Sequence, residues 1–80
     1  MTRDERSFFN DVKNAVSNYG CSFSHYHENG QFCVDVEVDD MDEWALCDDE
    51  IWDALNDVVH YWDGGIDQNA NVYYLGINLD

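Results

Sequence analysis

The dipeptide Asn29-Gly30 constrains the fold more than any other feature of the sequence. It separates two segments, residues 21–28 and 31–38, in which apolar and polar side chains alternate. Alternation with a period of two is typical of a half-buried β-strand, and Asn-Gly is the preferred pair in a two-residue type I′ turn. The two segments therefore predict a β-hairpin in which Glu28 faces Gln31.

The predicted register assigns each side chain of the hairpin to one of two faces, because successive side chains of a strand point in opposite directions. The face expected to form the core carries Cys21, Phe23, His25, His27, Phe32, Val34, Val36 and Val38. The face expected to contact water carries Ser22, Ser24, Tyr26, Glu28, Cys33, Asp35 and Glu37. Asp39 continues the water-facing side beyond the hairpin.

Segments with helical periodicity flank the hairpin. Residues 2–5, Thr-Arg-Asp-Glu, have the capping-box pattern, and apolar residues then recur at helical spacing up to Gly20. This predicts a first helix over residues 3–18. Residues 40–46 predict a short capped turn, and a second helix is expected to begin at Asp48, where acids suit the positive end of the helix dipole. The predicted buried side of the second helix consists of Ile51, Trp52, Leu55, Val58, Val59 and Trp62.

The C-terminal part predicts one further strand. Gly64-Gly65 is expected to end the second helix, and a polar loop leads to a strand over residues 72–79. The alternation there directs Tyr73, Leu75, Ile77 and Leu79 inward. The predicted fold is a single α+β domain over residues 1–80, in the order α-β-β-α-β, with two helices on one face of a small three-stranded antiparallel sheet. A right-handed return through the second helix favours the strand order 2-1-3.

Acidic residues exceed what folding requires. The net charge is −15, and no Lys or Arg follows Lys13. Two like charges about 7 Å apart repel by roughly 0.6 kcal/mol even in bulk water, whereas solubility of a small domain needs a net charge of only about 2–8. An aromatic content of 15% is unlike that of a disordered chain. We therefore expect a folded domain whose charge serves a function.

Many of the acids fall into two regular rows. One row is Asp35, Glu37 and Asp39 on the second strand, and the other is Asp49, Asp53 and Asp57 on the second helix. Successive carboxylates are about 6.6–6.8 Å apart along the strand and about 6 Å apart along the helix. A DNA strand carries one phosphate per about 3.4 Å, so the rows have a comparable charge density. A protein that holds phosphates in a Lys/Arg groove could accept such a surface.

Three features of the chain together give it a resemblance to a class of proteins. They are its small size, the acidic run from Asp35 to Asp57 and the absence of bases after Lys13. It resembles the small acidic DNA-mimic inhibitors of phages and mobile elements, which include anti-CRISPR and anti-restriction proteins and some nuclease-immunity proteins. The resemblance implies a cytoplasmic inhibitor that occupies the basic DNA- or RNA-binding groove of a CRISPR effector, a restriction enzyme or a nuclease.

The predicted partner-binding residues are Asp35, Glu37, Asp39, Asp40, Asp42, Glu43, Asp49, Asp53 and Asp57. Tyr26 and Trp44 are candidate aromatic anchors, because aromatic side chains often carry interface energy. Two other interpretations remain open. The acids of the second strand could protect an exposed sheet edge from aggregation, or the chain could be a small halophilic or structural domain whose acids only solvate it.

Other functions find less support in the sequence. Zinc-binding atoms are present on Cys21, His25, His27, Cys33, Cys47 and His60, but the short paired spacings of structural zinc sites are absent. Residues 67–71 imitate the start of an EF-hand loop, yet Val72 stands where Gly is required. We therefore expect no metal, cofactor or catalytic site. Direct nucleic-acid binding needs bases, and a membrane span needs about 20 apolar residues, so neither is expected. Three cysteines without a CxxC pair fit reduced thiols in a cytoplasm. The oligomeric state stays open.

Overall fold

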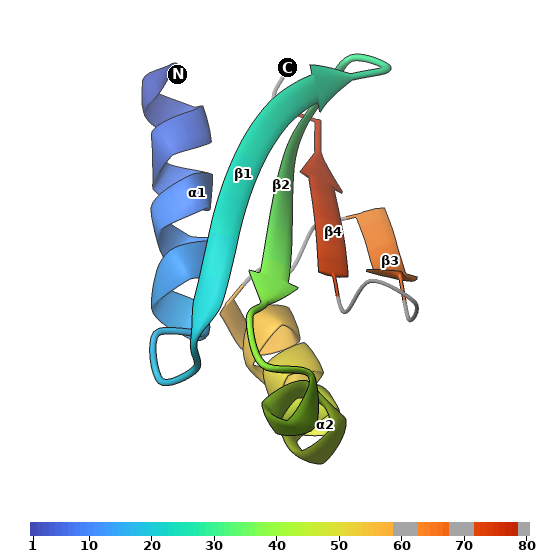
Figure 1. Cartoon of the computed structure of the whole chain (residues 1–80). Helices are drawn as coiled ribbons and strands as arrows, with labels where there is room; N and C mark the ends of the chain where they lie inside the picture. Colours follow the sequence, from blue (N-terminus) through green and yellow to red (C-terminus); the bar gives the residue numbers. More distant parts are fainter. Residues whose placement is uncertain (59–62, 68–71, 79–80) are drawn as a thin grey trace.

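A computed structural model describes residues 1–58, 63–67 and 72–78 (Figure 1). Its elements are α1 (Arg3–Ala15), β1 (Cys21–Glu28), β2 (Gln31–Val38), α2 (Met41–Val58), β3 (Asp63–Asp67) and β4 (Val72–Ile77). The predicted α+β class is confirmed, and so is the succession α-β-β-α-β, to which the structure adds the short strand β3 between α2 and the last strand.

The β1–β2 hairpin has the predicted register. Glu28 lies opposite Gln31 and Phe23 lies opposite Val36. Asn29 and Gly30 have φ values of 54° and 78°, the positive values that both central residues of a type I′ turn require. The turn chemistry therefore fixes which side chains of the two strands share a face.

The predicted capping box of α1 is also confirmed. The backbone N–H of Glu5 donates to the Thr2 hydroxyl at 3.2 Å, and the Thr2 N–H donates to the Glu5 carboxylate at 2.7 Å. The helix ends at Ala15 rather than at residue 18. Val16 is its C-cap, and its carbonyl accepts the N–H of Tyr19 at 3.1 Å in a turn that leads into β1.

The prediction of a short turn followed by a helix from Asp48 is wrong, because α2 is continuous from Met41. Asp40 caps it: one carboxylate oxygen accepts the N–H groups of Asp42 at 2.9 Å and Glu43 at 3.4 Å. No Gly or Pro interrupts residues 41–58, so nothing in the backbone chemistry ends the first turn. Of the predicted buried side, Ile51 and Leu55 are fully buried and Trp52 partly, while residues 59 and 62 lie outside the described part of the chain.

The sheet has four strands in the order β1-β2-β4-β3, and all its pairs are antiparallel. The three predicted antiparallel strands are present as β1, β2 and β4, and β3 adds a fourth at the edge, but the predicted order 2-1-3 is wrong because β2 lies between the other two. The last strand pairs with β2, with Val34 opposite Leu75 and Val36 opposite Tyr73. The reason is burial, since β2 has a continuous apolar side and takes a central place, whereas β1 carries exposed histidines and forms an edge. Gly64-Gly65, predicted to end the second helix, belongs to β3.

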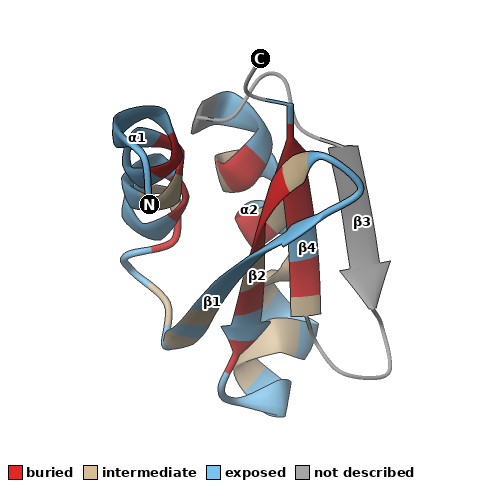
Figure 2. Cartoon of the chain, turned by 90° about the horizontal axis from the view of Figure 1, so that it is seen from above, coloured by how far each residue is buried: buried red, intermediate tan, exposed pale blue. Residues whose placement is uncertain are grey.

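Both helices cover the same face of the sheet, which we call the inner face (Figure 2). The buried apolar cluster there contains Phe8, Val12, Val16, Phe32, Val34, Val36, Val38, Ile51, Leu55, Tyr73, Leu75 and Ile77. The inward direction of Tyr73, Leu75 and Ile77 agrees with the sequence, and residue 79 lies outside the described chain. His25 and His27 were assigned to the core but are exposed, because they lie on the edge strand.

One polar group inside the cluster links α2 to the sheet. The hydroxyl of Tyr73 accepts the indole N–H of Trp44 at 2.9 Å and donates to the Asp48 carbonyl at 3.3 Å. Burial raises the pKa of Tyr73 to about 12, so the hydroxyl keeps its proton. These two bonds fix the first half of α2 on β4.

We expect Tyr73→Phe to lower stability by about 1–3 kcal/mol, because the indole N–H of Trp44 loses its acceptor. For a domain of this size the thermal midpoint should fall by at least roughly 4 °C, measured by circular dichroism. Tyr74→Phe is the matched control, since the Tyr74 hydroxyl has no hydrogen-bond partner among the described residues. Equal midpoints for the two variants would contradict the role of the Tyr73 hydroxyl.

Candidate functional site

The sheet divides the predicted partner-binding residues into separate groups. Asp35 and Glu37 point away from the core, on the face of the sheet that we call the outer face, because Val34 and Val36 occupy the alternate positions. The helix α2, which carries the other row, lies on the opposite side of the sheet, against the inner face (Figure 2). The structure therefore does not bring the two acid rows together on one surface.

The row on α2 points directly away from the core. With 3.6 residues per turn, Asp42, Asp49 and Asp53 lie on the side of the helix opposite Ile51 and Leu55. All three are exposed, as is Asp57 farther along. Within the part of the chain that the structure describes, these four carboxylates make no side-chain hydrogen bond or ion pair. Leu46 stands within the row and is 85% exposed.

Three of the predicted residues have structural roles where β2 leads into α2. Asp40 caps α2, as described above. The carboxylate of Glu43 accepts the N–H of Gly20 at 3.2 Å, and that of Asp39 accepts the Ser22 hydroxyl at 2.7 Å. These contacts fasten the connection after α1 to the start of α2. In the sequence, charge alone made these residues candidates for partner binding. Their hydrogen bonds give them a structural role as well.

On the outer face, Asp35 lies between two exposed tyrosines. The hydroxyl of Tyr26 on β1 donates to Asp35 Oδ1 at 3.2 Å. Tyr74 on β4 lies opposite Asp35 in the β2–β4 register. Tyr26 is 37% exposed and Tyr74 is 43% exposed. Partial burial and the neighbouring Asp35 carboxylate raise the pKa of Tyr26 to about 12, so its hydroxyl remains a donor. Tyr26 was predicted as an anchor from its position, but Tyr74 was not.

The basic side chains are confined to one helix. Arg3, Arg6 and Lys13 are all on α1, and the ammonium of Lys13 is 5.4 Å from the ring centre of Phe9. Among the described residues, the ion pair that the structure contains joins Glu5 and His27. Within the described residues, no acid of β2 or α2 therefore forms an ion pair.

The interpretation that acids protect an exposed edge does not fit β2, because β2 lies between β1 and β4. Its carboxylates point out of the sheet plane, where they cannot block edge pairing. The edges are β1 and β3. This removes one of the alternative explanations for Asp35 and Glu37.

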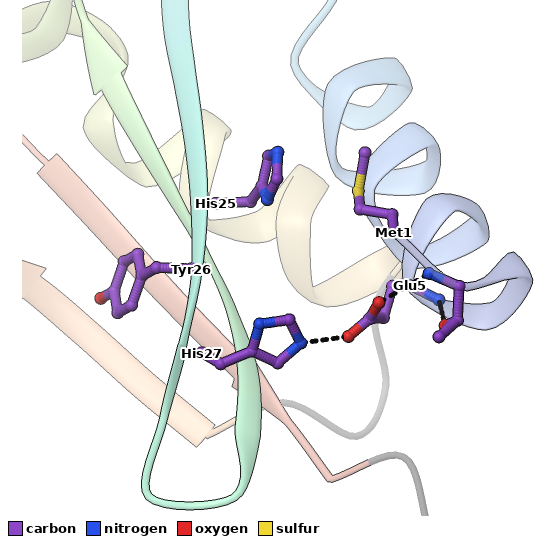
Figure 3. A pocket seen from close by; sticks show the side chains of 6 residues that line it. Met1, Glu5, His25, Tyr26 and His27 are labelled. Atoms are coloured by element: carbon purple, nitrogen blue, oxygen red, sulfur yellow. Dashed lines mark hydrogen bonds and ion pairs between the residues drawn. The ribbon is translucent and has the colours of Figure 1, made fainter.

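A shallow pocket lies between the edge strand β1 and the start of α1 (Figure 3). His25, Tyr26 and His27 line it from β1, and Glu5 lines it from α1. His27 Nε2 contacts Glu5 Oε2, and the hydrogen bond from the Thr2 backbone, followed by His27, lowers the pKa of Glu5. This contact holds β1 against α1. It also occupies the carboxylate of Glu5, the acid that lines this pocket beside the two histidines.

The described residues contain no cluster of three His, Cys, Asp or Glu side chains that could hold a metal ion. Cys33 lies on the outer face, as the hairpin register predicted, and so points away from Cys21 and the histidines. His60 and residues 68–71 of the EF-hand-like segment lie outside the described residues. No helix in residues 1–58, 63–67 and 72–78 is both long and apolar enough to cross a membrane.

The three thiols lie in surroundings that disfavour the thiolate. Burial, followed by the carboxylates of Asp39 and Glu43, raises the pKa of Cys21 to about 11. Burial and nearby acids also raise the pKa values of Cys33 and Cys47. Because the thiolate is the nucleophile, this arrangement is the opposite of the one that activates a catalytic cysteine.

We expect all three cysteines to react slowly with a thiol reagent at pH 8. A raised pKa means that the thiolate appears only as the pH approaches that value, so the rate for Cys21 should keep rising up to about pH 11. The measurement uses a Cys33→Ser/Cys47→Ser variant, with free cysteine as the reference. A rate for Cys21 at pH 8 equal to that of free cysteine would contradict the expectation, and the two other single-cysteine variants test Cys33 and Cys47 in the same way.

Comparisons with protein-family models, with curated proteins and with solved structures find no significant match to this chain.

Proposed function

We propose that this chain is a nucleic-acid-mimic inhibitor that blocks the basic DNA- or RNA-binding groove of a nucleic-acid-handling protein. The proposed setting is a phage anti-CRISPR or anti-restriction protein acting in the host cytoplasm. The observation that carries the proposal is the placement of unpaired carboxylates on rigid elements, with no Lys or Arg after Lys13 to neutralise them.

Rigid placement supports mimicry because a charge mimic must hold its carboxylates at set distances. Asp35 and Glu37 follow each other on β2 at about 6.6–6.8 Å, and Asp49 and Asp53 on α2 are about 6 Å apart along the axis. Each row therefore offers one charge for about every two phosphates of a strand. Fully buried Val34, Val36, Ile51 and Leu55 hold these two elements in the core.

The position of the rows on opposite sides of the molecule is compatible with this function. The principal dimensions are 37 × 22 × 18 Å, and the two shorter ones resemble the thickness of a duplex. One acid row can therefore lie in the groove while the other faces outward. Charge on both sides also speeds the approach to a basic groove by long-range attraction.

The test is competition with DNA. We expect the purified chain to reduce DNA or RNA binding by a member of a panel of CRISPR effectors, restriction enzymes and nuclease toxins. A β2-row variant, Asp35→Asn/Glu37→Gln, and an α2-row variant, Asp49→Asn/Asp53→Asn, test the rows separately. A close interfacial charge pair is worth about 1.5 kcal/mol or more, so the variant of the contacting row should bind roughly 100-fold more weakly.

The matched control is Asp4→Asn/Asp11→Asn on α1, which removes the same charge from exposed positions outside the rows. It should lose mainly association rate, by less than about tenfold, through weaker steering. Inhibition of no panel member, or equal losses from all three variants, would overturn the proposal.

The alternative of a halophilic or structural domain predicts a different response to salt. Screening shortens the reach of repulsion to about 8 Å at physiological salt and about 3 Å at 1 M. If the acids are kept for binding, the chain should already fold at low salt, and its thermal midpoint should rise with moderate NaCl. Folding that begins only above about 1 M salt, followed by circular dichroism, would favour the halophilic alternative.

A further inference from the structure

The outer face of the sheet is a candidate contact surface with a composition of its own. It carries Ser22, Ser24, Tyr26, Asp35, Glu37 and Tyr74, from β1, β2 and β4. Both helices lie on the inner side, and no described element covers the outer side (Figure 2). The acids of this face therefore stand beside aromatic rings on the open side of the sheet.

Asp35 is the centre of this surface. Its Oδ1 accepts the Tyr26 hydroxyl at 3.2 Å, which orients the carboxylate. Directly opposite residues of an antiparallel pair have Cβ atoms about 4.5–5.5 Å apart, so the ring of Tyr74 begins beside the same carboxylate. The second oxygen of Asp35 and the carboxylate of Glu37 have no partner among the described residues. Two acceptors and an aromatic ring are thus available together.

This combination matches the chemistry of arginine better than that of lysine. A guanidinium is planar, donates two parallel hydrogen bonds to a carboxylate and stacks on an aromatic ring, whereas an ammonium is a compact, strongly hydrated point charge. The acid row of α2 lacks such rings. Trp44 and Trp52 are packed against the core, and Leu46 is the large side chain exposed within the row. That row therefore offers only negative charge, and a lysine or an arginine side chain can neutralise it equally well.

We propose that the outer face is the part of this chain that contacts its partner, and that it binds an arginine-presenting segment laid along β2. The inference rests on the proposed function and names which acid row makes the contact. Each guanidinium bonds to Asp35 or Glu37, and one of them stacks on Tyr74. The row on α2 contributes long-range attraction.

Charge decides against other occupants of this face. The described part of the outer face has acids and no base, and a second copy of the chain would bring another net charge of −15 toward it. An anionic lipid surface or a nucleic acid would be repelled for the same reason. A cationic protein segment is the partner whose charge complements the surface.

The test uses the full chain and two defined probes, a peptide of ten arginines and a peptide of ten lysines, titrated by calorimetry at physiological salt. We expect the arginine peptide to bind several-fold more tightly. Amide chemical shifts in the NMR spectrum should move most around Tyr26, Asp35 and Tyr74. Equal affinities for the two peptides, or shifts centred on Asp49 and Asp53, would overturn the inference.

Variants separate the ring from the charge. Tyr74→Thr should lower affinity for the arginine peptide about three- to fivefold and leave that for the lysine peptide unchanged, while Tyr74→Phe should keep the preference because it keeps the ring. Asp35→Asn/Glu37→Gln should weaken arginine-peptide binding tenfold or more. The matched α2 variant, Asp49→Asn/Asp53→Asn, should weaken both peptides equally and by less than threefold. An α2 variant that loses as much as the outer-face variant would contradict the proposal.

The two proposals fail in different ways. If no nucleic-acid-handling protein is inhibited but the arginine preference maps to Tyr74 and Asp35, the proposed function is wrong and the outer face still binds arginine. If inhibition is found and only the α2-row variant loses it, mimicry stands and the assignment of the outer face is wrong.

Discussion

The alternation of side chains along β2 is the constraint on which the rest of this structure depends. Val34, Val36 and Val38 are fully buried on the inner face, and Asp35 and Glu37 stand between them on the outer face. A slip of one residue in the strand pairing would exchange these two sets of side chains. It would bury carboxylates without hydrogen-bond partners and so strongly destabilise the folded state. Hydrophobic burial and charge exposure therefore fix the same register. Both helices pack on the buried side of this strand, and β4 pairs along its edge within the sheet.

The arrangement also limits the cost of a net charge of −15. An α-helix with its side chains is about 10–12 Å across, so the rows on α2 and on β2 are separated by a helix and the sheet. That separation exceeds the screening length of about 8 Å at physiological salt. Repulsion is then largest within each row. Asp39, Asp40 and Glu43, which crowd the start of α2, accept hydrogen bonds from Ser22 and backbone N–H groups.

The two surfaces differ in what they can recognise. On α2 the exposed acids stand beside one another and beside the exposed Leu46, so their effect is mainly the field they create. On the outer face Tyr74 lies opposite Asp35 in the register, and Tyr26 hydrogen-bonds to Asp35 from the neighbouring strand β1. Specific recognition needs directional contacts in addition to charge, and this second surface provides them.

Features that depend on near neighbours in the chain could be predicted from the sequence. The capping box of Thr2 and Glu5 and the turn at Asn29-Gly30 follow from local chemistry, and the inward side of β4 follows from its alternation. The strand β3 could not be predicted, because Gly64-Gly65 has the form of a helix stop, and these residues become a strand only by pairing with β4.

The sequence by itself determined that Asp35 and Glu37 share a face, that Asp49 and Asp53 share another, and that no base stands near them in the chain. Periodicities of two and of 3.6 residues are local properties, and they require no knowledge of the fold. Only the tertiary structure decided that these two faces point in opposite directions and that Tyr74 lies beside Asp35. Both facts depend on which strand pairs with β2. That pairing is set by the burial of apolar side chains from segments that lie far apart in the chain.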